Sequence, residues 1–159
     1  MDITEFASKS FAFRDELHML HLRTKSYPEH VALEEMYKFQ LKWLDSFLEA
    51  WQGFDGPIDF DIVHAEPKNN SVYVIEDYIG TVLMTAKGEM AEDMEIYGWA
   101  VNEIETVMKQ CFQTLYKLKN FVDNSGKKEE RCWSGYEPVP GKKPYSPGSC
   151  RKEDLPSTE

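Results

Sequence analysis

Apolar residues recur every three or four positions along the first part of the chain, the spacing that places side chains on one face of an α-helix. A first helix is predicted over residues 4–25 and a second from Tyr27 to about Gln52. The second begins at Ser26-Tyr27-Pro28-Glu29, which has the form of a capping box, and is expected to stop at Gly53. Its apolar face carries Leu33, Met36, Tyr37, Gln40, Leu44, Phe47 and Trp51.

Two more helices are predicted after a connection, residues 53–70, that is rich in Gly, Pro and Asn. The third covers Ser71 to about Thr85, although its first residues would also suit a strand, and Lys87-Gly88 is expected to break it. The fourth runs from about Ala91 to Val122. Four long helices joined by short links predict an all-α protein built as a four-helix bundle.

The remainder of the chain changes in character. From Lys127 onward Pro and Gly are frequent and almost no aliphatic residue occurs before Leu155, so this segment cannot build a core. We therefore expect two parts: a helical domain over residues 1–123 and a disordered or extended tail over residues 124–159.

Composition favours a folded protein of the cytoplasm. The 159 residues, 42% of them hydrophobic, suffice for one domain. No apolar run is long enough to span a membrane, and the first residues lack the regions of a signal peptide. Cysteine usage agrees, because Cys111 falls in a helical pattern and only Cys132 and Cys150 in the tail could pair.

Charge separates the two parts. Residues 1–123 hold 11 Lys/Arg and 22 Asp/Glu, a net charge of −11, whereas residues 124–159 hold 7 and 6, a net charge of +1. An acidic domain attracts cations and repels phosphate, so only the slightly basic tail is a candidate for contact with DNA.

The predicted second helix carries a row of residues that can ligate metals. His30, Glu34, Asp45 and Glu49 are spaced by four, eleven and four. At about 100° per residue they fall at about 0°, 40°, 60° and 100°, so they share one stripe beside the apolar face. One helix cannot bring both ends of the row to one metal, because 15 residues span roughly 22 Å. Two antiparallel copies related by a two-fold axis can do so, and they create two equivalent sites.

These spacings resemble the Dps-type mini-ferritins. The ferroxidase centre of that family uses a His on the first helix, a second His twelve residues later and carboxylates four, eleven and four residues further on. His18, His30, Glu34, Asp45 and Glu49 match every one of these offsets. The run His18-Met19-Leu20-His21-Leu22-Arg23-Thr24-Lys25-Ser26-Tyr27 also resembles ferritin-like proteins of unknown function that tailed bacteriophages carry.

The resemblance implies a ferritin-like four-helix bundle that forms a homo-oligomer, a two-fold dimer at least and up to a dodecamer. It implies an inter-subunit site for ferrous iron, with His18, His30 and Glu34 from one subunit and Asp45 and Glu49 from its mate. The chain would then be a ferroxidase. It departs from the family at Glu34, which is commonly Asp there, and it lacks the Glu-x-x-His pairs of conventional ferritins.

Other interpretations remain open. The acidic residues could form a solvated helix face, and the histidines could be interface residues, with His21 competing with His18 for the role on the first helix. The site could take iron, another divalent metal or none. The alternative function is a catalytically silent ferritin-like scaffold that acts by binding other proteins. If the chain is a phage protein, it would be located in the cytoplasm of the host cell.

The tail has its own candidate residues. Residues 131–150 resemble a segment that recurs at the ends of assorted phage proteins. Its basic and aromatic side chains could bind DNA by charge and stacking, or tether a host or phage protein. These residues are Lys127, Lys128, Arg131, Trp133, Tyr136, Lys142, Lys143 and Tyr145.

Overall fold

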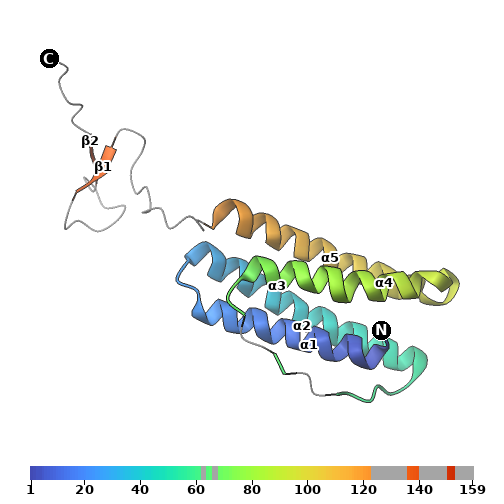
Figure 1. Cartoon of the computed structure of the whole chain (residues 1–159). Coiled ribbons are helices and arrows are strands. Elements are labelled where there is room, and N and C mark those ends of the chain that lie inside the picture. The colour runs from blue at the N-terminus through green and yellow to red at the C-terminus, as the bar shows by residue number, and fades with distance from the viewer. Residues whose placement is uncertain (62–63, 66–67, 123–135, 140–149, 153–159) are drawn as a thin grey trace. The chain divides into compact units, whose positions relative to one another are not determined.

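The computed structural model describes residues 1–61, 64–65, 68–122, 136–139 and 150–152 (Figure 1). The chain forms two units, Met1–Val122 and Asp123–Glu159, and each is described by itself. The elements described in the first unit are all helical, and α1, α2 and α5 lie lengthwise beside a further rod in which α3 and α4 follow end to end (Figure 1).

The first two helices are α1, Ile3–Arg23, and α2, Tyr27–Asp55. The predicted start of α2 is confirmed, because the Ser26 side chain accepts a hydrogen bond from the Glu29 backbone N–H. The predicted end is wrong. The helix continues through Gly53 and stops at Gly56, whose φ of 96° lies in the left-handed region that only glycine adopts at little cost.

The predicted third helix is longer than expected. The segments α3 (Ser71–Tyr78), the π-helical turn η1 (Ile79–Leu83) and α4 (Met84–Met90) follow one another without a gap. The expected break at Lys87-Gly88 does not occur, since one glycine costs a helix only about 1 kcal/mol. The chain turns instead at η2, Ala91–Asp93, where Asp93 caps α5, Met94–Phe121.

The core is formed by one apolar face from each helix. Helix α2 packs against both α1 and α5, and α3 also contacts α1 and α5. The apolar face predicted for α2 is buried, apart from Tyr37, which is half-buried. Each buried Leu or Phe contributes about 1.5–3 kcal/mol of transfer free energy. The largest fully buried side chains include Phe6, Leu17, Leu33, Met36, Leu44, Phe47, Ile75, Leu83, Ile104 and Leu118.

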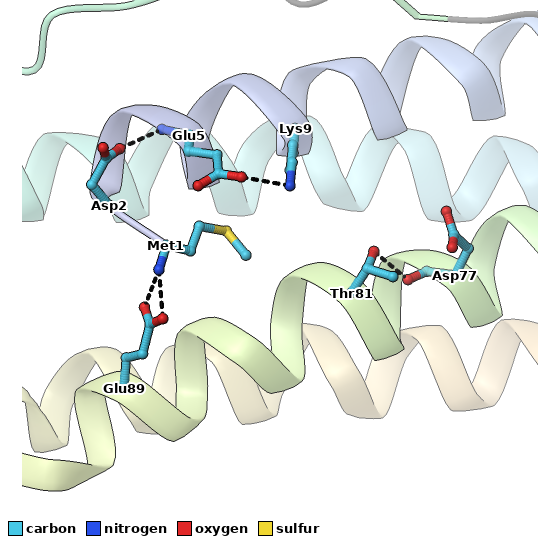
Figure 2. Close-up of polar contacts among 7 residues, drawn as sticks. All are labelled: Met1, Asp2, Glu5, Lys9, Asp77, Thr81 and Glu89. Carbon is cyan, nitrogen blue, oxygen red and sulfur yellow. Dashed lines mark hydrogen bonds and ion pairs between the residues drawn. The ribbon is translucent and has the colours of Figure 1, made fainter.

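Polar contacts at the start of α1 join it to α4. The Met1 ammonium group donates to both carboxylate oxygens of Glu89 at 2.5 Å, and the Asp2 side chain accepts from the Glu5 backbone N–H at 2.8 Å (Figure 2). The Met1 side chain itself is almost fully buried. The Asp2 contact caps α1, and the Met1–Glu89 pair holds the start of α1 against the last turn of α4.

A polar group lies at the centre of the core. The Tyr78 hydroxyl is hydrogen bonded to Ser10 Oγ at 2.8 Å and accepts from Gln40 Nε2 at 3.0 Å. Gln40 Oε1 is buried without a partner in the described part of the chain. Burial raises the pKa of Tyr78 and also raises the pKa of the Cys111 thiol to about 12. Both buried groups are therefore uncharged at neutral pH.

The second unit contains two short antiparallel strands, β1 (Tyr136–Pro138) and β2 (Cys150–Lys152). Tyr136 pairs with Lys152 and Pro138 with Cys150. The backbone of the expected disordered or extended tail thus includes a strand pair. Cys132 lies outside the described residues, and so does its proposed pairing. None of the helices described could cross a membrane, because none is both long and apolar enough.

The polar centre gives a prediction about stability. Replacing Tyr78 by Phe leaves Ser10 Oγ and Gln40 Nε2 without their partner in the core, which costs about 1–3 kcal/mol. Replacing Gln40 by Leu removes the unpaired oxygen and leaves Tyr78 bonded to Ser10, so we expect a change below about 1 kcal/mol. Urea unfolding measures both, and a larger loss for Gln40→Leu than for Tyr78→Phe would contradict this view of the core.

The raised pKa values give a prediction about alkaline pH. A group whose pKa is raised by folding stabilises the protein below its unfolded pKa, and this stability is lost as the pH rises. For Cys111 the window runs from 9.0 to about 12. We expect the free energy of unfolding to fall by about 1.4 kcal/mol per pH unit for each such group. Cys111→Ala should be less stable at neutral pH yet show a shallower alkaline decline; an unchanged slope would contradict the assignment.

Candidate metal-binding site at the first helix turn

Two histidines face each other across the turn between α1 and α2. The rings of His21 and His30 stack with centroids 3.8 Å apart. His21 Nδ1 lies 3.0 Å from the carbonyl oxygen of His30, and His30 Nδ1 lies 3.1 Å from the carbonyl oxygen of His21. Because a carbonyl oxygen only accepts, each Nδ1 must donate. In the neutral rings both Nε2 atoms therefore keep a lone pair, the form that ligates metals.

The turn itself is held by a carboxylate. Glu29 accepts from Thr24 Oγ1 and, at 2.7 Å, from Ser71 Oγ at the start of α3. Thr24 Oγ1 also accepts from the Ser26 backbone N–H at 3.1 Å. Glu29 thus does not return to Ser26 as a capping box predicts, but links the turn to α3. This fixes the separation between the histidine-bearing ends of α1 and α2.

Glu34, His18 and Tyr37 complete the group. The pKa of Glu34 is lowered, first by the hydrogen bond and charge of Lys38 and then by the charges of His21 and His30. The His18 ring stacks on Tyr37 at 4.4 Å and lies 6.0 Å from the His21 ring. We call these five residues, His18, His21, His30, Glu34 and Tyr37, the imidazole cluster.

The two histidines of α1 differ in their surroundings. His21 is buried, at 7% exposure, and contacts His30 directly, whereas His18 is exposed. The spacing of twelve residues between His18 and His30 predicts His18 as the ligand from the first helix and leaves His21 as the weaker candidate. Sequence alone did not identify the contact, because it depends on how three residues, Thr24 to Ser26, reverse the chain.

The cluster contains three of the five residues predicted for the site, namely His18, His30 and Glu34. Asp45 and Glu49 are exposed on α2, about three to five turns beyond Glu34 and His30. Within one copy, the described residues contain no group of three His, Cys, Asp or Glu side chains that could hold a metal ion. Lys38 is also paired with Glu34, so a metal that binds Glu34 must displace this ammonium group.

The donor chemistry fits a divalent transition metal. Imidazole nitrogen and carboxylate oxygen are ligands that Fe²⁺, Zn²⁺ and related ions accept. Backbone carbonyls that orient the Nδ1 atoms are the usual outer contacts of ligating histidines, and His21 and His30 have them before any metal arrives. A partner that supplied further carboxylates would complete the coordination.

The candidate residues of the tail lie almost entirely outside the described part of the chain. Lys127, Lys128, Arg131, Trp133, Lys142, Lys143 and Tyr145 lie outside the described residues, and only the backbone of Tyr136 is placed, in β1. DNA or protein binding through this segment stays a prediction.

Comparison with known proteins gives a family and no named relative. Residues 21–118 match a model described as a family of unknown function, DUF5856. No curated protein and no solved structure matches the chain. The matched region contains all of α2, with His30, Glu34, Asp45 and Glu49, and begins at His21. Because the match covers more than half of the 159 residues, the chain belongs to this family of unknown function.

Proposed function

We propose that the helical unit is a ferritin-like four-helix bundle that binds ferrous iron between two copies and oxidises it. The observation that carries the proposal is the imidazole cluster, where the Nδ1 contacts leave a lone pair on each Nε2 and Glu34 follows His30 by about one turn of α2. Four helical rods support the fold: α1, α2, the continuous α3–η1–α4 run, and α5.

One two-fold axis can bring His30 of one copy to Glu49 of the other and Glu34 of one copy to Asp45 of the other. His30 and Glu49 are equally far from a point between Phe39 and Gln40, and so are Glu34 and Asp45. An antiparallel pair of α2 helices crossing at that point therefore sets the imidazole cluster of one copy against the exposed acids of the other. The contact is isologous, so it produces two identical sites.

The exposed side of α2 is suited to such a contact. Leu41 is 47% exposed and falls at about 20° from His30, within the ligand stripe and next to the two-fold point. An apolar side chain there would pack against its own copy. Lys38 and Lys42 flank it and would meet acids of the partner helix. In such a dimer Lys38 could pair with a carboxylate of the partner helix, which would free Glu34 from its ion pair with Lys38.

Ferrous iron is the substrate in this proposal. His30 and Glu34, with His18 or His21, would bind it from one copy, and Asp45 and Glu49 from the other. Each Fe²⁺ gives up one electron, so four Fe²⁺ and four protons reduce one dioxygen to two water molecules. The carboxylates stabilise the higher charge of Fe³⁺. Further acidic side chains of this unit, whose net charge is −11 over residues 1–123, would hold the oxidised iron.

Mixing two inactive variants tests the shared site. His30→Ala/Glu34→Ala lacks one half of each site and Asp45→Ala/Glu49→Ala lacks the other, so each alone should lose ferrous oxidation at least tenfold. A mixed dimer keeps one complete site. Co-refolding the two variants in equal amounts should therefore recover about a quarter of the wild-type rate, since half of randomly paired dimers are mixed. Mixtures no faster than the separate variants would exclude a site shared between copies.

The second candidate function is a metal-free scaffold that acts by binding other proteins. The ion pair of Lys38 with Glu34 favours it, because this lysine already neutralises the carboxylate. Molecular mass measured with elemental analysis separates the two. An oligomer as large as a dodecamer that retains iron supports the first function. A monomer or dimer that binds no added Fe²⁺, Zn²⁺ or Co²⁺ supports the scaffold.

A further inference from the structure

An apolar groove runs along the outer side of α5. It has a volume of about 840 Å³ and is bordered on one side by Lys87 of α4. Met108, Phe112, Tyr116 and Phe121 line it. Phe112, Tyr116 and Phe121 are 53%, 60% and 59% exposed, a concentration of aromatic surface that monomeric proteins seldom leave uncovered.

The rim of this groove is basic although the unit is acidic. Lys87, Lys109 and Lys117 border it, against one acidic lining residue, Glu105. Lys87 pairs with Glu105 at 2.6 Å, and Lys117 pairs with Glu35. Lys109 makes no hydrogen bond or ion pair within the described residues. The groove therefore suits a partner that combines apolar side chains with negative charge.

The same chain carries a segment with that composition. All six residues from Ala91 to Ile96, at η2 and the first turn of α5, are exposed. We call this segment the tip. Met94 and Ile96 present apolar side chains there, at 53% and 46% exposure. Its acidic residues are Glu92, Asp93 and Glu95.

One copy cannot place its own tip in its own groove. Both features belong to α5, a continuous helix, and Met94 and Phe112 are separated by 18 residues, or about 27 Å of rigid axis. Complementary surfaces held apart in this way can meet only between copies. We propose that the tip of one copy docks in the α5 groove of a second copy.

This contact differs in kind from a two-fold contact through α2. It joins unlike surfaces, so every copy offers one groove and one tip, and the contacts close into a ring or continue as a filament. Met94 and Ile96 would lie on Phe112 and Tyr116, while Glu92 and Glu95 would face the rim lysines. The proposal uses none of the imidazole cluster and stands whether or not iron is bound.

Photo-crosslinking tests the proposal on the full chain. A benzoylphenylalanine at position 112 is irradiated in an equal mixture of ¹⁵N-labelled and unlabelled protein. We expect cross-linked peptides that join position 112 of one isotopic form to the tip of the other. A cross-link to the segment after Val122, to any other region or to no protein would overturn the proposal.

Surface variants provide an independent readout. Phe112→Lys disables the groove and Met94→Lys disables the tip, so each should reduce the mass measured by light scattering. Mixing the two should restore a single contact, from the intact groove of one to the intact tip of the other. Tyr73→Lys is the matched control, because Tyr73 is 54% exposed on α3 outside the groove. A mass that falls equally with Tyr73→Lys, or no gain on mixing, would contradict the proposal.

Discussion

Burial of one face of α2 between α1 and α5 is the constraint on which the rest of this unit depends. With 3.6 residues per turn, a helix that buries Leu33, Leu44 and Phe47 must direct other positions outward. In the row His30, Glu34, Asp45 and Glu49, the first two residues are half-buried at the border between the two faces and the last two are exposed. Its placement is thus a consequence of packing, and any function of the row depends on what covers this border.

The turn from α1 to α2 brings two histidines together beside that border. His21 and His30 each donate a ring N–H to the other's backbone carbonyl, so both imidazoles are oriented by backbone that the Glu29 carboxylate also holds. Ligands that are oriented in advance lose less conformational freedom on binding. Among its described residues one copy has no group of three side chains that could hold a metal ion, and the carboxylates of the proposed site, Asp45 and Glu49, lie farther along the same helix.

Sequence predicted the features that are local in origin. The start of α2 followed from Ser26 and Pro28, and its buried face from the spacing of apolar residues. The positions of glycines did not predict the helix ends well. Gly53 and Gly88 lie inside helices, because a helix tolerates a glycine where packing on either side holds it. Gly56 instead has the left-handed backbone that ends α2. The contact of His21 with His30 could not be predicted, since it depends on the geometry of the turn rather than on helical spacing.

Two α2 helices that lie antiparallel about a point between Phe39 and Gln40 are the basis of the proposed iron site. Distances between spin labels on the two copies test this arrangement, after Cys132 and Cys150 are replaced by Ser and with Cys111 left buried. A label at Lys42, close to that point, should give a separation below about 25 Å, and one at Asp55 should exceed about 40 Å. Two similar distances, as in a parallel pair, or no interaction between copies at either position, would contradict it.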